Sequence, residues 1–84
     1  MNELNSLRNI GKELAKKLNF IGISTADELK ATGSEEAFIR MKIHYPNVCL
    51  VHLMAIEGAI SDVEYNQLPD DVQQRLKEFS DSLK

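Results

Sequence analysis

The chain has 84 residues, of which 43% are hydrophobic and 27% are charged, a composition typical of one soluble globular domain rather than of a disordered segment. Its formal charge of −3 at pH 7 argues against a general affinity for polyanions, which requires a basic surface. The charge is uneven, because residues 1–30 carry five basic and four acidic side chains whereas residues 61–84 carry three basic and six acidic.

Helical spacing of apolar residues recurs along the chain, and no segment alternates as a strand would. The sequence therefore predicts an all-α fold, a compact bundle of four to six short helices forming a single domain over residues 1–84. A short first helix is expected over residues 2–7, and the stretch RNIG then interrupts it. A second helix is expected over residues 11–19. Its apolar stripe consists of Ile10, Leu14 and Leu18.

Two further helices are expected before the proline of the HYPN stretch. The first begins at a capping box formed by Thr25 and Glu28, reaches about residue 31, and ends at Gly33. Ser34 is expected to open the second, with acidic residues in its first turn, and this helix stops where the proline disfavours helical backbone. Its inner face is formed by Phe38, Met41 and Tyr45.

Residues 48–60 are apolar on nearly every side, so they predict the central helix of the bundle, with Asn47 as its N-cap. The run is shorter than the roughly 20 residues that cross a bilayer, which favours a buried helix. Gly58 inside it is unfavourable by about 1 kcal/mol relative to alanine unless a neighbouring helix packs closely there. Cys49, the one cysteine, is expected to be a buried small hydrophobic residue.

A last helix is expected to begin with Pro69 at its first position, followed by acidic residues in the first turn. Its apolar stripe consists of Val72, Leu76, Phe79 and Leu83. A single cysteine cannot form an internal disulfide, and no basic segment followed by an apolar core opens the sequence. These features predict a cytoplasmic protein.

The stretch LRNIGKELAKKL predicts a helix-hairpin-helix-like element within residues 4–31. In such an element a tight turn leaves the first amides of the following helix unpaired, and these amides bind a nucleic-acid phosphate. Gly11 would supply permissive backbone, Asn9 tolerates a left-handed conformation, and Ile10 would anchor the turn in the core. The candidate nucleic-acid-binding residues are Asn9, Ile10, Gly11, Lys12 and Lys16.

The same stretch also fits a purely structural turn. Two lysines on a solvated helix face are common, and Asn9 stands where the usual hairpin has its first glycine. Lys17 lies nearer the apolar stripe, where its stem would pack while its ammonium group reaches water. From these residues alone, both a structural hairpin and a weak phosphate-binding hairpin remain open.

No motif predicts catalysis, a metal or a cofactor. Cys49 and His52 lie three residues apart and His44 is the only other histidine, whereas a zinc site needs three or four convergent ligands. The paired carboxylates at residues 35–36 and 70–71 are explained by the positive ends of helix dipoles. Met41 and Met54 are expected in the core, and no small-molecule substrate is expected.

Several ordered segments carry a resemblance to a known family: LRNIGKELAKKLNFIGISTADEL, GSEEAFIRMK, LVHLMAIEGAI and LPDDVQQRLKEF. Together they resemble the C-terminal domain of TfoX/Sxy-type competence regulators over about residues 4–79. The resemblance implies a small helical domain with a helix-hairpin-helix-like element, linked in bacteria to control of DNA-uptake genes together with a transcription activator. Two departures are the absence of the N-terminal TfoX domain and Lys12, which stands where a proline is expected after the glycine.

The sequence thus predicts a non-catalytic regulatory or adaptor module that acts through protein–protein contacts or self-association and does not enter membranes. The acidic surface of residues 62–81, or the apolar stripe of the last helix, would dock the partner. The alternative is weak, sequence-independent DNA binding through the hairpin turn.

Overall fold

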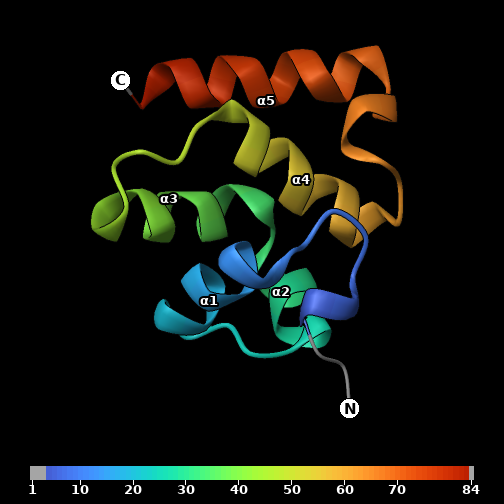
Figure 1. Ribbon diagram of the computed structural model, residues 1–84. Coiled ribbons are helices and arrows are strands. Elements are labelled where there is room, and N and C mark those ends of the chain that lie inside the picture. Colours follow the sequence, from blue (N-terminus) through green and yellow to red (C-terminus); the bar gives the residue numbers. More distant parts are fainter. Residues whose placement is uncertain (1–3, 84) are drawn as a thin grey trace.

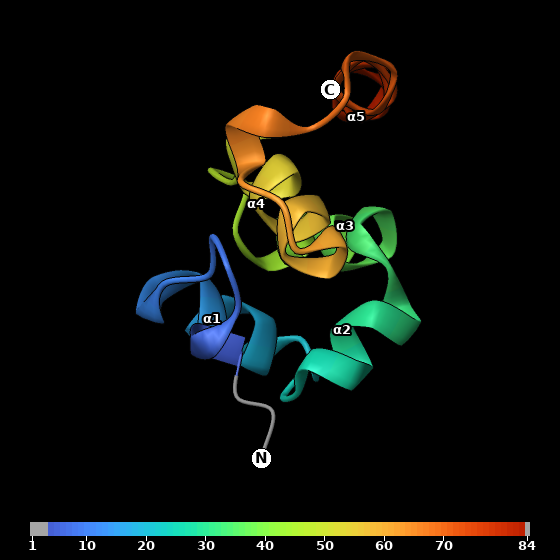
Figure 2. The same ribbon diagram turned by 90° about the vertical axis from the view of Figure 1, so that its right-hand side faces the viewer.

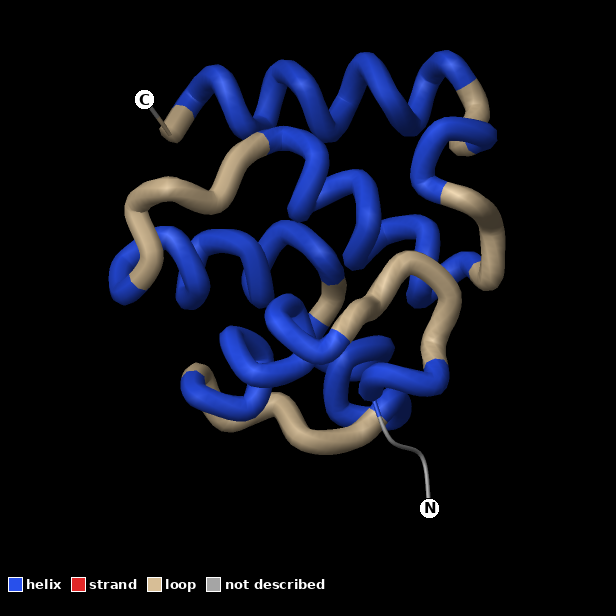
Figure 3. Tube along the Cα trace, in the orientation of Figure 1, coloured by secondary structure: helices blue, strands red, loops and turns tan. Residues whose placement is uncertain are grey.

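The computed structural model describes residues 4–83, and within this range every regular element is a helix (Figure 3). In chain order the elements are the 3-10 helix η1 (Leu4–Ser6), α1 (Lys12–Phe20), α2 (Ala26–Thr32), α3 (Ser34–His44), α4 (Leu50–Ser61), the 3-10 helix η2 (Tyr65–Gln67) and α5 (Asp70–Ser82). The all-α prediction is confirmed. The expected first helix is only a 3-10 turn in its described part, and residues 2 and 3 lie outside the described range.

Helix α4 lies in the middle of the molecule, with α5 across one side and the other helices on the opposite side (Figure 1). In the view turned by 90°, α5 is seen almost end-on above α4, while α1 and α2 lie below α3 and α4 (Figure 2). Helix α4 contacts α2, α3, α5 and η2, and its Leu53 and Ile56 are completely buried. The prediction of a central apolar helix is confirmed, and no described helix is long and apolar enough to cross a membrane.

The predicted start of the central helix is wrong by two residues, and with it the burial of Cys49. Val48 points into the core, with 2% of its surface exposed, and its N–H donates to the carbonyl of Tyr45 over 3.1 Å. This turn delays the helix, so Cys49 rather than Asn47 is the N-cap. Because Val48 points inward, the thiol of Cys49 is exposed instead of buried.

The start of α2 follows the predicted capping box. The Glu28 N–H donates to the Thr25 hydroxyl over 3.1 Å, and the Thr25 N–H donates to the Glu28 carboxylate over 3.1 Å. The prediction that Ser34 opens α3 is confirmed, since Ser34 is its first helical residue and Gly33 is the N-cap, at a φ of 86°. The buried Ser34 hydroxyl donates to a carboxylate oxygen of Glu57 in α4, over 2.6 Å.

Helix α5 covers α4 with the predicted apolar stripe. Leu76 is completely buried, and the other stripe residues are partly buried against the core. Pro69 is the N-cap rather than the first helical residue, one position from the prediction. On the polar side of α5, Arg75 lies 3.4 Å from the Glu57 carboxylate and 3.8 Å from that of Glu35, so it joins α5 to both α4 and α3.

Candidate functional site

In the turn that precedes α1, Asn9 and Ile10 behave as predicted and Gly11 does not, while the helix-hairpin-helix-like element itself stays a prediction. Asn9 adopts a left-handed conformation with a φ of 71°, as expected, and Ile10 is buried in the core with 4% of its surface exposed. Gly11 has a φ of −89° and lies in extended backbone that any residue adopts. The permissive position of this turn is therefore Asn9, and the prediction that Gly11 supplies it is wrong.

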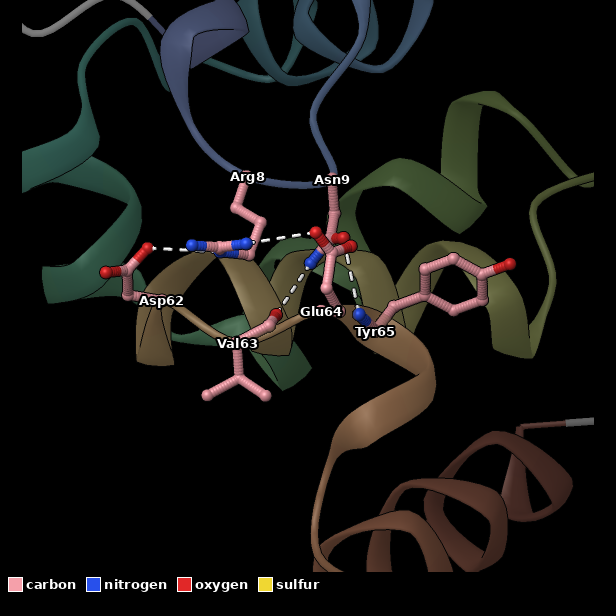
Figure 4. A network of polar contacts seen from close by, with 6 residues as sticks. All are labelled: Arg8, Asn9, Asp62, Val63, Glu64 and Tyr65. Carbon is pink, nitrogen blue, oxygen red and sulfur yellow. Dashed lines mark hydrogen bonds and ion pairs between the residues drawn. The ribbon is translucent and has the colours of Figure 1, made fainter.

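The side chain of Asn9 fastens the turn to the segment that follows α4 (Figure 4). Its Nδ2 donates to the carbonyl oxygen of Val63 over 2.9 Å, and its Oδ1 accepts the N–H of Tyr65 over 3.3 Å. The two bonds cross-link segments separated by more than half of the chain. The amide of Asn9 thus has a structural partner on each of its polar atoms.

Arg8 makes a second set of contacts to the same segment (Figure 4). Its Nε lies 3.3 Å from the carboxylate of Asp62 and its Nη1 lies 3.0 Å from that of Glu64. The hydrogen bonds to Glu64 and then Asp62, with the charges of both carboxylates, raise the pKa of Arg8 above its ordinary value. These pairs are solvent-exposed, so they orient the turn more than they stabilise it.

The turn that precedes α1 packs directly against Gly58 of α4. A Cβ atom built at Gly58 would collide with Nδ2 of Asn9 and with the carbonyl oxygen of Val63. Gly58 does have close neighbours, but they are the turn before α1 and the segment after α4 rather than another helix. The absence of a side chain at Gly58 lets these two segments approach α4 closely.

The first turn of α1 is open. Gly11 provides no side-chain cap, and the N–H groups of Lys12, Glu13 and Leu14 have no hydrogen-bond acceptor within residues 4–83. Such amides carry the partial positive charge of the helix dipole. Lys12 and Lys16 are both exposed, and the ammonium group of Lys16 lies 3.8 Å from the carboxylate of Glu13.

Beside this open turn runs a depression that we call the α1–α4 groove. It consists of two adjoining hollows of about 490 Å³ and about 300 Å³. Asn9, Lys12, Lys17, Val51, His52 and Tyr65 are among the residues lining the larger hollow. Lys17 and His52 continue into the smaller one, where they meet His44 and Tyr45.

The groove combines cationic and apolar side chains. Neither Lys12 nor Lys17 lies within ion-pair distance of a carboxylate among residues 4–83, and the Lys17 ammonium group lies 5.6 Å from the centre of the Tyr45 ring. Val51 and Tyr65 are large apolar side chains that nevertheless expose 53% and 41% of their surface. The half-buried Lys17 agrees with the prediction that its stem packs beside the apolar stripe.

His52 lies at the junction of the two hollows. Burial and then the charge of Lys17 lower its pKa. The N–H of Cys49 donates to His52 Nδ1 over 3.1 Å, and the Cys49 thiol lies 3.6 Å from the same nitrogen. His52 thus caps α4 in its neutral form and adds no charge to the groove near neutral pH.

The structure separates the five candidate residues of the sequence prediction. Asn9, Gly11 and Lys12 line the α1–α4 groove, whereas Ile10 is buried and Lys16 points to solvent without lining either hollow. The residues that sequence reasoning did not place in a site are Lys17, Val51, His52 and Tyr65. No local pattern marks them, because they come from three elements that meet only in the folded chain.

Elsewhere, a third hollow of about 490 Å³ lies between α3 and α5. Arg75 and its partner carboxylates Glu35 and Glu57 line it, so its charges are already paired with one another. No group of three or more potential metal-ligating side chains comes together among the described residues.

Comparison with known proteins gives a family and two structural relatives. The family model described as the TfoX C-terminal domain matches residues 1–80. A crystal structure of an uncharacterized protein from Listeria monocytogenes, in a triclinic form, is 41% identical, with a TM-score of 0.94 over 95% of this chain and 91% of that one. A tetragonal crystal form of a Listeria monocytogenes protein of unknown function is 40% identical, with a TM-score of 0.95 over 98% and 100% of the two chains. No protein with a curated description matches the chain.

Proposed function

Because this chain belongs to the TfoX C-terminal domain family, we propose that it is a non-catalytic regulatory or adaptor module that acts by contacting another protein. The setting is the control of transcription and competence in a bacterial cytoplasm. The family match supports this setting, and the fold supports a module that presents surfaces rather than encloses a substrate. Within the described residues, the two hollows of about 490 Å³ each are open to the surface.

The observation that carries the proposal is the mixed surface of the α1–α4 groove. Exposed Val51 and Tyr65 lie beside Lys12 and Lys17, whose charges no carboxylate of the described chain neutralises. Interfaces between proteins combine apolar and aromatic centres with a polar rim in this way. The groove therefore supports a protein-contacting role.

The Cys49–His52 pair also fits a non-catalytic role. A nucleophilic thiol needs a base that is free to take its proton. Nδ1 of His52 already accepts the N–H of Cys49, and that bond caps the first turn of α4. Helix capping accounts for the spacing of the two residues.

The proposal is tested by affinity capture with quantitative mass spectrometry, comparing the wild type, the groove variant Lys17→Glu/Val51→Asp and the control Lys30→Glu. Lys30 is an exposed lysine of α2 that lines neither hollow of the groove. We expect at least one protein to be retained by wild type and control and lost from the groove variant. If all three baits retain the same proteins, or none, the proposed adaptor role of this surface is wrong.

The open first turn of α1 favours a second candidate, weak sequence-independent DNA binding. The N–H groups of this turn that have no hydrogen-bond acceptor lie near Lys12 and Lys16 in the sequence, and such an arrangement suits a phosphate group. The net charge of −3 weighs against it.

Salt-titrated binding to duplex and single-stranded DNA tests the second candidate. If DNA binds, the logarithm of affinity should fall with the logarithm of salt concentration with a slope of about −0.9 per neutralised phosphate. The double variant Lys12→Glu/Lys16→Glu should then abolish binding, with Lys30→Glu as the matched control. Absence of binding at low salt would rule this candidate out.

A further inference from the structure

We propose that the α1–α4 groove binds an acidic peptide segment of another protein, with carboxylates of the peptide at Lys12 and Lys17 and a large apolar residue against Val51 and Tyr65. This inference rests on the proposed adaptor function and names the chemistry of its partner. Three observations support it: the size of the groove, the distribution of charge and the exposed apolar side chains.

The dimensions of the groove suit a short segment of chain. Its larger hollow, about 490 Å³, lies within the range of about 300–1,000 Å³ that is typical of ligand-binding pockets. The smaller hollow, about 300 Å³, shares Lys17 and His52 with it, so the two form one continuous depression along α1 and the start of α4. Together the two hollows offer room for a short segment of chain.

The charge distribution selects an anionic occupant. All three arginines of the chain lie within ion-pair distance of carboxylates: Arg8 with Asp62 and Glu64, Arg40 with Glu36, and Arg75 with Glu35 and Glu57.

In contrast, Lys12 and Lys17 line the groove without a carboxylate partner among the described residues. Glu13 also lines the larger hollow, but its carboxylate lies 3.8 Å from the ammonium group of Lys16 outside the groove. Carboxylates entering the groove would complete ion pairs that the isolated chain leaves open.

The apolar side chains select a peptide that also carries a hydrophobic residue. Val51 and Tyr65 come from α4 and η2, line the same hollow and remain about half exposed, although this small domain buries most of its other large apolar residues. An apolar anchor that covers such residues supplies much of the energy of a protein interface. Tyr45, at the far end, adds an aromatic surface beneath the Lys17 ammonium group.

These features favour a polypeptide over a nucleic acid. A phosphate backbone needs a row of cations at regular spacing, whereas this groove has two lysines, an acidic residue and an apolar wall. Isolated carboxylates next to an apolar side chain match two separated cations. The chain's own charge of −3 would also repel a polyanion more strongly than a short acidic segment.

The experiment is selection of a random 12-residue phage-displayed peptide library on the full chain. We expect the selected peptides to be enriched in Asp or Glu together with Leu, Phe, Tyr or Trp, relative to the unselected library. A fluorescein-labelled peptide of the selected consensus should bind wild type and Lys30→Glu equally. It should bind Lys17→Glu and Val51→Ser about tenfold more weakly or worse. Thermal unfolding followed by circular dichroism checks that each variant is folded.

Several outcomes overturn the inference. They are the absence of any enriched peptide, enrichment of peptides without acidic residues, and equal binding to the wild type and Lys17→Glu. Binding of a 20-nucleotide single-stranded DNA that competes with the peptide and is lost in the same variants would assign the groove to nucleic acid instead. Sedimentation equilibrium showing a dimer that Lys17→Glu dissociates would assign it to a second copy of this chain.

The two proposals fail in different ways. If groove-dependent proteins are captured from lysate but the selected peptides are not acidic, only the chemistry of the partner is wrong. If no captured protein depends on the groove and selection also yields nothing, the adaptor role itself is wrong.

Discussion

Replacement of Asn9 should destabilise the domain, although this residue lies in a half-exposed turn. Asn9→Ala removes the hydrogen bonds to the Val63 carbonyl, over 2.9 Å, and from the Tyr65 N–H, over 3.3 Å. It also places an alanine at a φ of 71°. The two bonds contribute about 1 kcal/mol each, and the left-handed backbone costs alanine about 1–2 kcal/mol.

The expected loss is therefore about 3 kcal/mol of unfolding free energy. A domain of this length has a total stability of about 4–13 kcal/mol, so the loss is a large fraction of it. Asn9→Gly loses the same hydrogen bonds without the backbone penalty and should lose about 2 kcal/mol. The difference between the two variants measures the contribution of the left-handed conformation alone.

Urea unfolding followed by circular dichroism measures both values. With a denaturant slope of about 1–3 kcal/mol/M, the midpoint for Asn9→Ala should fall by about 1–3 M. Asn19→Ala, at an exposed position near the end of α1, is the matched control and should stay within about 0.5 kcal/mol of wild type. Asn9→Gly with wild-type stability would refute the role of the side-chain bonds. Asn9→Ala no less stable than Asn9→Gly would refute the backbone argument.

Two further changes test the same region. On an exposed helix face, Gly58→Ala would raise the unfolding free energy by about 1 kcal/mol. Here the new Cβ would collide with Asn9 and Val63, so we expect the unfolding free energy to fall by about 1–3 kcal/mol in the same urea assay. A gain in stability would contradict the close packing. The pKa of His52 is lowered in the folded state, so below about pH 6.5 the unfolded chain binds more protons at this residue. The unfolding free energy should therefore decrease as the pH falls from about 6.5 to the folded pKa of His52. This decrease should be smaller in His52→Gln. Urea unfolding at a series of pH values measures it, with His44→Gln as the matched variant. An unchanged pH profile in His52→Gln would show that His52 is not the residue responsible.

Much of the fold follows from local sequence. The spacing of Ile10, Leu14 and Leu18 fixes the buried face of α1, since a helix brings every fourth residue to the same side. The capping box of Thr25 and Glu28 fixes the start of α2, because both of its hydrogen bonds lie within four residues. The family resemblance, which rests on ordered segments along nearly the whole chain, is likewise a property of the sequence.

Tertiary packing decides details that local preference leaves open. Ser34 opens α3 as predicted, but its hydroxyl donates to Glu57, which lies 23 positions away and which no local rule identifies. Cys49 lies in an apolar run of the sequence, but Val48 points into the core and Cys49 remains at the surface. Spacing along the run does not say which of these two adjacent apolar residues the core receives.

The α1–α4 groove was decided by tertiary structure alone. Sequence reasoning placed Lys12 beside an open helix start, and there the local signal ended. Lys17, Val51 and Tyr65 belong to α1, α4 and η2, and they line one depression because contacts distant in the sequence bring these elements together, among them those of Arg8 and Asn9 with the segment after α4. Periodicity specifies which face of each helix is buried, whereas the exposed faces that meet across a groove are set by contacts between elements distant in the chain.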